Sequence, residues 1–254
     1  QNGLITWNTN FYSQGNYNIQ VKISDGDIDK VKNFNLTVNN ISNQALRLDG
    51  INDYVELNNS FTLNTRSSSI EAWLYVEDFS TDLDRQNKVT LLMDKGARTH
   101  RYISIGNNGF NSEFDTNMVY NRGTTSMIKE KQFFHFALVF DNNTSYFYID
   151  GELEDSQSVN EETLTLQQIG HIINDSDYQS GYSSWYDGVI DELRIWNDSR
   201  TQTEIKNNIN KRLTGNETSL LHYYDMENIS SGKIIDKAGN NDGIIQGGQQ
   251  INTN

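Results

Sequence analysis

The chain has 254 residues, of which 35% are hydrophobic and 11% aromatic, and its formal net charge is −14. This apolar content is enough to bury one large core or two modest ones. The excess of acidic residues disfavours nucleic acid and anionic lipid as partners, because both are polyanions. The sequence contains no cysteine and no apolar run of about 18 residues, which excludes disulfides and thiolate metal sites and gives no indication of membrane insertion.

Residues 1–42 differ in pattern from the rest of the chain. Apolar residues alternate with polar ones in Asn16–Ser24, Asp25-Gly26 forms a turn signal, and the alternation resumes at Phe34, Leu36 and Val38. This pattern predicts a β-hairpin. It resembles the last strands of immunoglobulin-like and cadherin-like repeats, so we interpret residues 1–42 as a partial module of that kind. Because an isolated hairpin is marginally stable, we expect it to pack on the rest of the chain or to belong to a longer multidomain protein.

The polar segment 39–44, NNISNQ, is the expected boundary between this module and a second domain over residues 43–254. Beyond the boundary, short runs of β-branched and aromatic residues recur between Asn, Asp, Gly and Ser clusters, at 70–76, 88–94, 101–105, 133–140, 145–149 and 164–169. Asp150-Gly151 is a two-residue hairpin signal. This spacing predicts an all-β domain.

Three ordered motifs relate the second domain to a known family. They are ALRLDGINDYVE at 45–56, HFALVFDNNTSYFYIDGE at 135–152 and YDGVIDELRIWN at 186–197. The chain therefore resembles the laminin G-like, concanavalin A-like lectin and glucanase domains. That resemblance implies a jelly-roll sandwich of two antiparallel sheets. It also implies that the tail, LLHYYDMENISSGKIIDKAGNNDGIIQGG at 220–248, pairs back into the sheets.

One short helix is expected, starting at a capping box formed by Thr201 and Glu204 and ending before Gly215. The residues Ile205, Ile209 and Leu213 follow one another at helical spacing. The family resemblance implies that this helix covers one face of the sandwich.

Acidic turns suggest a metal site. The resemblance implies that Asp49, at the end of one strand, and Asp191, on the last strand of the motif, lie at neighbouring strands, and Asn52 is a further oxygen donor. We expect these three residues to hold a structural calcium ion, because calcium accepts six to eight oxygen ligands in loose geometry. The alternative is that Asp49 only shapes its turn and Asp191 only caps a strand. A second polar cluster, Asp236, Asn240 and Asp242, is interpreted as turn chemistry, with a metal site as the alternative.

Catalytic residues are not expected. Glucanases of this architecture need two carboxylates facing one cleft, about 5 to 5.5 Å apart in retaining enzymes. The nearest match is Glu113 and Asp115, and no third carboxylate follows at the required spacing. The adjacent Asp191 and Glu192 would point to opposite faces of a regular strand. The four histidines show no metalloprotease spacing, and His135, within an apolar strand, is expected to be a hydrogen-bonded core or rim residue.

A ligand site is predicted in the segment NDSDYQSGYSSWYD at 174–187, which contains Tyr178, Tyr182, Trp185 and Tyr186. Aromatic rings flanked by Asn, Asp and Gln suit sugars, whose rings have apolar faces and hydroxyl rims. The alternative is that Trp185 and Tyr186 lead into the next strand and pack inside. A basic group at 98–101 (Arg98, His100 and Arg101) is interpreted as a solvated loop, with an acidic glycan as the alternative.

The sequence therefore predicts an extracellular or cell-surface binding module that is not an enzyme. Its expected partners are glycans or surface glycoproteins, with neighbouring copies or domains of the same protein as further partners. The second hypothesis is a structural subunit or spacer of a surface layer, filament or adhesin, without a sugar site. The third is a glycoside hydrolase of the laminarinase type. Fold resemblance alone does not choose among them.

Overall fold

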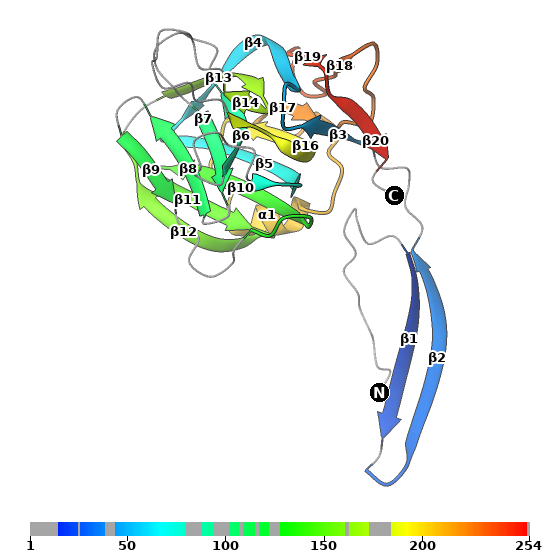
Figure 1. The fold of residues 1–254 in the computed structure, drawn as a ribbon. Coiled ribbons are helices and arrows are strands. Elements are labelled where there is room, and N and C mark those ends of the chain that lie inside the picture. Colours follow the sequence, from blue (N-terminus) through cyan, green and yellow to red (C-terminus); the bar gives the residue numbers. More distant parts are fainter. Residues whose placement is uncertain are drawn as a thin grey trace. The chain divides into compact units, whose positions relative to one another are not determined.

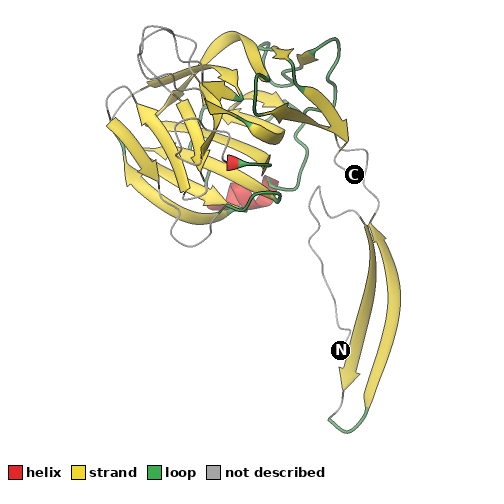
Figure 2. Ribbon diagram, viewed as in Figure 1, coloured by secondary structure: helices red, strands yellow, loops and turns green. Residues whose placement is uncertain are grey.

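A computed structural model describes ten segments of the chain, which are residues 15–24, 26–38, 44–79, 88–93, 102–106, 109–114, 117–121, 128–160, 163–172 and 184–252. The chain divides into two compact units, one of residues 1–43 with 252–254 and one of residues 44–251. Strands dominate both units (Figure 2). In the segments that are described, no helix has the length and apolar character needed to cross a membrane.

The first unit is an antiparallel hairpin of β1 (Gly15–Ser24) and β2 (Asp29–Val38), as the sequence predicts (Figure 1). Ile19 lies opposite Phe34 and Tyr17 opposite Leu36, so one face of the hairpin is apolar. This face is poorly covered, because Ile23 is 69% and Phe34 46% exposed. Membership of an immunoglobulin-like module stays a prediction.

The second unit contains two eight-stranded sheets, which we call sheet 1 and sheet 2. Sheet 1 has the order β12 (Glu152–Ser158), β11 (Thr144–Ile149), β10 (Phe133–Asp141), β5 (Ser67–Val76), β16 (Asp187–Trp196), β3 (Gln44–Asp49) and β20 (Gln249–Asn252), and β17 (Leu220–Tyr224) also pairs with β16. Sheet 2 has the order β18 (Lys233–Ile234), β19 (Gly243–Gln246), β4 (Tyr54–Asn64), β13 (Thr163–Ile169), β6 (Lys88–Met93), β7 (Tyr102–Gly106), β8 (Gly109–Phe114) and β9 (Asn117–Asn121). A short ladder of β14 (His171–Ile172) and β15 (Ser184–Trp185) accompanies them. The predicted sandwich of antiparallel sheets is confirmed.

The core lies between the two sheets and follows from strand alternation. On β5, Ile70, Ala72, Leu74 and Val76 join the main apolar cluster, and on β4 its members are Val55, Leu57, Phe61 and Leu63. The intervening residues face outward, away from this cluster. Glu71 and Trp73 therefore lie on the outer face of sheet 1, and Tyr54 and Glu56 on the outer face of sheet 2.

Helix α1 (Gln202–Asn208) covers the outer face of sheet 1, as the family resemblance implies. The predicted capping box is present: Thr201 Oγ1 accepts a hydrogen bond from Glu204 N, and Glu204 Oε2 accepts one from Thr201 N at 2.8 Å. Ile205 is fully buried and packs on Ala137, Val139 and Tyr148. The helix is thus held by apolar contacts on one side and by its cap at the start.

The tail after α1 is part of the sandwich, because β17 and β20 pair in sheet 1 while β18 and β19 extend sheet 2. Asp236 organises the turn before β19. Its carboxylate accepts hydrogen bonds from the backbone N–H groups of Tyr223, Ala238, Gly239 and Asn241, and lies 2.7 Å from His222 Nδ1. This arrangement agrees with turn chemistry at Asp236.

Candidate functional site

Three aromatic side chains gather beside sheet 2: Tyr54 at the start of β4, His171 on β14 and Trp185 on β15. His171 and Trp185 are direct partners in the β14–β15 ladder. Their rings are stacked, with centroids 4.8 Å apart and planes inclined by 17°. The Tyr54 ring lies 4.2 Å from that of His171 and 6.3 Å from that of Trp185. We call these three residues the aromatic cluster.

Local chain geometry explains why the rings meet. Tyr54 points away from the core because its neighbour Val55 points into it. Gly170, immediately before His171, has φ +95°, and a Cβ atom there would lie 2.3 Å from Leu48 Cδ1. Only glycine fits this turn, which ends β13 and starts β14.

Burial sets the chemistry of His171. Its side chain is fully buried, both ring nitrogens lack a hydrogen-bond partner within the described segments, and Tyr54 and Trp185 are each half-buried. Desolvation lowers the pKa of His171 to about 4, although the nearby Glu56 carboxylate opposes this shift. The imidazole is therefore neutral at physiological pH and has one donor and one acceptor to offer.

Tyr186 is not part of this cluster, which corrects the prediction that it faces a ligand. Its ring is completely buried in the main core. The hydroxyl donates toward the backbone carbonyls of Tyr75 at 3.3 Å and Val189 at 3.4 Å. Burial also raises the pKa of this phenol well above its ordinary value. Adjacent residues of an extended chain point to opposite sides, so Tyr186 turns inward where Trp185 turns outward.

The other two predicted ligand residues, Tyr178 and Tyr182, lie outside the described residues, as do Arg98, His100 and Arg101. The ends of their segments are nevertheless placed. Residues 173–183 connect β14 to β15, so the predicted aromatic segment begins and ends at the aromatic cluster. Residues 94–101 follow β6 in the sequence, and the last residue of β6, Met93, pairs with Gln168 of β13.

The three predicted calcium ligands do not form one site. In the β16–β3 ladder, Asp187 lies opposite Asp49, whereas Asp191 lies four residues further along β16, opposite Trp73 of β5. Asp49 Oδ1 accepts hydrogen bonds from the backbone N–H groups of Ile51 at 2.9 Å and Asn52 at 3.3 Å. Asp191 is fully buried, and its Oδ1 accepts from Glu192 N at 2.8 Å.

The residues therefore do not fit a calcium ion shared by Asp49 and Asp191. The geometry matches the alternative for Asp49, which shapes its own turn. Within the described segments, no group of three or more His, Asp or Glu side chains could hold a metal ion. Calcium binding by the chain stays a prediction without an assigned set of ligands.

The predicted hydrolase residues are only partly placed. Glu113 lies on β8, opposite Tyr102 of β7 and Met118 of β9. Asp115 lies outside the described residues. Hydrolysis by Glu113 and Asp115, whose separation would distinguish a retaining from an inverting cleft, therefore stays the third hypothesis.

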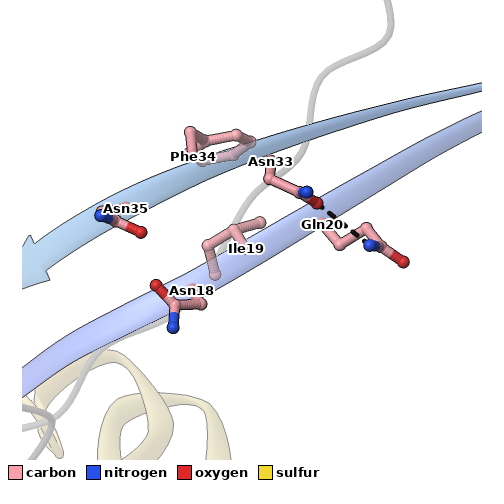
Figure 3. Close-up of a pocket in the computed structure, with 6 residues that line it drawn as sticks. All are labelled: Asn18, Ile19, Gln20, Asn33, Phe34 and Asn35. Carbon is pink, nitrogen blue, oxygen red and sulfur yellow. Dashed lines mark hydrogen bonds between the residues drawn. The ribbon is translucent and has the colours of Figure 1, made fainter.

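A hollow of about 500 Å³ lies on the hairpin of the first unit, lined by Asn18, Ile19, Gln20, Asn33, Phe34 and Asn35 (Figure 3). Gln20 Nε2 donates to Asn33 Oδ1 at 3.0 Å across it. The amides of Gln20 and Asn33 thus pair with each other, and of the lining residues only Ile19 is half-buried while the others are exposed. The hollow lacks the buried, convergent polar groups typical of a small-molecule site.

Comparison with known proteins identifies the family. A sequence profile named Laminin_G_3, of the concanavalin A-like lectin/glucanases superfamily, matches residues 49–206, which is more than half of the chain. The chain belongs to this superfamily. The matched range contains Tyr54, His171 and Trp185. No curated protein matches the chain in sequence.

Solved structures support the same fold. A protein from Bacteroides ovatus, provisionally assigned to carbohydrate binding, superposes with a TM-score of 0.63 at 18% identity. That match covers 91% of this chain, which spans 65% of the Bacteroides protein. The heptameric SAP-like pentraxin of Limulus polyphemus gives a TM-score of 0.54 at 12% identity, covering 82% of this chain and 96% of the pentraxin. At these identities the likeness concerns the fold.

Sequence reasoning missed Tyr54 and His171 as candidate site residues. Tyr54 belongs to the first family motif, and its alternation with Val55 and Leu57 indicates the outer face of the strand. No metal-binding spacing surrounds His171. Its position directly after a glycine that ends a strand, and directly before the predicted aromatic segment, was the available signal.

Proposed function

We propose that the chain is an extracellular, non-catalytic module that binds glycans at the aromatic cluster. The observation that carries this proposal is the aromatic cluster, in which the half-buried rings of Tyr54 and Trp185 lie 4.2 Å and 4.8 Å, between ring centroids, from the buried imidazole of His171. His171 is fully buried, so it supports the two rings from beneath, whereas Tyr54 and Trp185 have the accessible surface that a sugar can contact.

The rings of Tyr54 and Trp185 supply an apolar surface for stacking against a sugar. Stacking of an aromatic side chain on the apolar face of a sugar needs a rigid, partly exposed ring, and Trp185 is rigid because its indole is stacked on His171. Glu56 lies two residues after Tyr54, on the same face of β4, and pairs across the ladder with Gln168. These two side chains provide hydrogen-bonding groups beside the rings.

Binding without hydrolysis is the proposed mode of action. The superfamily includes both lectins and glucanases by its description, so membership alone is neutral on this point. The aromatic cluster contains no carboxylate pair, and a glycosidase needs two. Glycans or glycoproteins at a cell surface are the proposed partners.

The second hypothesis, a structural subunit or spacer that contacts neighbouring copies or domains, is favoured by a different observation. The apolar face of the hairpin remains exposed at Ile23, Phe34 and Leu36. Exposed apolar faces of this kind are typical of contacts with another protein surface. The two hypotheses involve different units of the chain, so one experiment can separate them.

A glycan array tests the proposal with three forms of the full chain: the unmodified protein, Trp185→Ala and Phe34→Ala. Each variant removes one partly exposed aromatic ring, and Phe34→Ala is the matched control on the hairpin. We expect Trp185→Ala to lose retention of any glycan bound by the unmodified protein and Phe34→Ala to keep it. Equal retention by all three forms would contradict the site. Reducing sugar released from β-glucan, and lost on Glu113→Gln, would support the hydrolase instead.

A further inference from the structure

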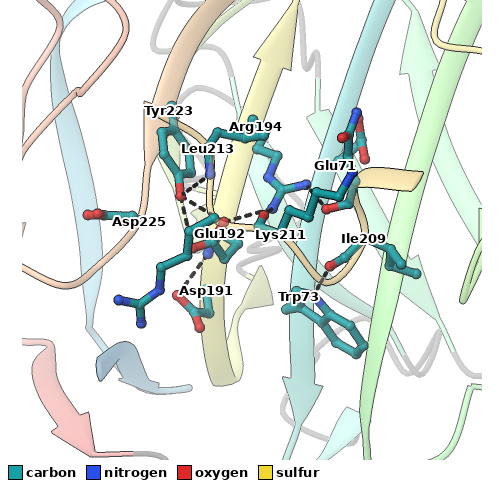
Figure 4. A network of polar contacts seen from close by, with 12 residues as sticks. Glu71, Trp73, Asp191, Glu192, Arg194, Ile209, Lys211, Leu213, Tyr223 and Asp225 are labelled. Carbon is teal, nitrogen blue, oxygen red and sulfur yellow. Dashed lines mark hydrogen bonds and ion pairs between the residues drawn. The ribbon is translucent and has the colours of Figure 1, made fainter. Parts of the chain in front are cut away.

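The outer face of sheet 1 contains a buried polar network beneath α1 and the segment that follows it (Figure 4). Arg194 of β16 is completely buried. It pairs with Glu192 Oε2 at 2.8 Å and donates to the backbone carbonyls of Asn208 at 3.1 Å and Lys211 at 2.6 Å. Trp73 Nε1 donates to the carbonyl of Ile209 at 2.9 Å. The network thus holds the segment from α1 to Leu213 on the sheet.

A second carboxylate lies beside this guanidinium. Glu71 of β5 pairs directly with Arg194 in the β5–β16 ladder and is completely buried. His135 of β10 is 1% exposed, and its Nε2 lies 3.5 Å from Glu71 Oε2. The Trp196 indole is a neighbouring donor that favours an ionised Glu71. By strict geometry, however, neither carboxylate oxygen of Glu71, neither ring nitrogen of His135 nor Trp196 Nε1 makes a well-formed hydrogen bond within the described segments. His135 is therefore buried as predicted, but its ring is not satisfied by ordinary partners.

The charges around the pair come from several elements. Glu192 and Arg194 face it from β16, Arg200 and Glu204 from the start of α1, and Tyr223 from β17, where its hydroxyl donates to Glu192. The turn after β11 contributes Asp150, whose Oδ1 accepts from the backbone N–H of His135 at 2.8 Å. Glu192 already neutralises Arg194. Arg200 likewise pairs with Glu204, with its Nη1 3.2 Å from Oε1. An ionised Glu71 would therefore add a buried negative charge to two cations that already have carboxylate partners.

We propose that Glu71 and His135 hold one proton between them, on the Glu71 carboxyl, and that this proton keeps the segment from α1 to Leu213 docked on sheet 1. The neutral acid can donate toward His135 Nε2, which lies near enough for a small adjustment to close the bond. A neutral Glu71 also does not compete for the Arg194 guanidinium, which can then donate hydrogen bonds to Glu192 and to the backbone carbonyls of the docked segment. Burial supports this assignment, since desolvation raises the pKa of Glu71 and holds that of His135 well below its ordinary value.

The proton count predicts a particular pH profile. The ordinary pKa values of these two groups are 4.5 for Glu71 and 6.5 for His135. Above pH 6.5, the unfolded chain carries no proton on either group, whereas the folded chain carries one. Each unit of rising pH therefore increases the equilibrium constant of unfolding tenfold, up to the pH at which Glu71 ionises in the folded chain. Below pH 4.5 the unfolded chain carries two, so unfolding becomes tenfold more favourable per unit of acidification. Between these values both states carry one proton and the pair contributes no slope.

Urea unfolding of the full chain from pH 3.5 to 9 tests the proposal with Glu71→Gln and His135→Gln, because each variant should change the profile differently. In Glu71→Gln, the loss of stability that the pair causes at rising pH (the alkaline slope) disappears. The loss of stability on acidification (the acid slope) begins near pH 6.5 rather than 4.5. Without the His135 imidazole, the acid slope disappears and the alkaline slope begins near pH 4.5. A surface control, Glu130→Gln, removes an exposed carboxylate in the segment before β10, whose Oε1 accepts a hydrogen bond from Phe79 N, and should retain the unmodified profile.

Two measurements on the unmodified protein keep the proposal testable if a variant fails to fold. The NMR signals of the His135 ring should stay at their neutral positions from pH 8 to pH 5. Amide hydrogen exchange of residues 205–213, corrected for its intrinsic pH dependence, should accelerate as Glu71 ionises on the alkaline side. A His135 ring that titrates near pH 6.5, or a Glu71→Gln profile parallel to that of the unmodified protein, would overturn the proposal.

Discussion

The indole of Trp185 lies almost parallel to the imidazole of His171, with ring centroids 4.8 Å apart. The two residues face each other across the β14–β15 ladder, the two strands that residues 173–183 connect. The contact therefore fixes a half-exposed ring at the base of the segment in which the sequence predicts a ligand site. The predictions below concern this arrangement and the frame that holds it.

His171 should remain neutral over the physiological pH range, because burial lowers its pKa to about 4. The ordinary pKa of histidine, near 6.5, applies to the unfolded chain. As the pH falls from 6.5 towards the lower pKa of the folded chain, only the unfolded chain binds the additional proton, so folding stability decreases. NMR should show no movement of the His171 ring signals between pH 8 and pH 5. Glycan affinity should be unchanged over the same range, and a midpoint near 6.5 would contradict the burial argument.

Tyr186 should behave as a core residue. Tyr186→Ala is expected to reduce the free energy of unfolding by about 3–5 kcal/mol, as large-to-small core substitutions do. Tyr186→Phe removes only two long hydrogen bonds and should cost about 1 kcal/mol. Denaturant unfolding measures both. A Tyr186→Ala protein of normal stability that no longer binds glycan would return Tyr186 to the ligand site.

Asp49 and Asp191 should contribute to stability independently, because they face different strands and share no partner in the ladder. Thermal unfolding of Asp49→Asn, Asp191→Asn and the double variant is expected to give effects that add within about 0.5 kcal/mol. Asp191→Asn should have the larger effect, since Asp191 is fully buried. A coupling well above 1 kcal/mol that vanishes in excess chelator would establish a calcium ion common to both residues.

Residues 43–254 should fold without the hairpin. Sheets 1 and 2 are built entirely from strands after Asn43, whereas the hairpin forms a sheet of its own. Deletion of residues 1–40 is therefore expected to leave near-native circular dichroism and cooperative unfolding, with a melting temperature within a few degrees of the full chain. An unfolded or aggregated product would mean that the hairpin completes the sandwich.

The sequence predicted the fold well because its strongest signals are local. Alternation along 70–76, the Asp150-Gly151 turn and the Thr201 capping box each depend on residues close together in the chain, and all three occur where expected. The order of the three family motifs then limited the topology.

The site was predicted less completely because it depends on register and on side-chain direction. Asp49 and Asp191 were paired from neighbouring strands, but the ladder places Asp187 opposite Asp49, and a bulge between Asp191 and Arg194 shifts the register further. Glu192, in that bulge, has φ +52°, a conformation that its sequence gives no reason to expect. Strand pairing of this kind follows from packing across the whole sheet.

Glycan binding at the aromatic cluster can be tested by NMR titration of the full chain with a retained glycan. The indole signal of Trp185 and the ring signals of His171 should shift with a common dissociation constant. The indole signals of Trp73 and Trp196, buried on the outer face of sheet 1, should stay unchanged. Shifts confined to Trp73, Trp196 or the hairpin, with Trp185 and His171 unaffected, would contradict the account.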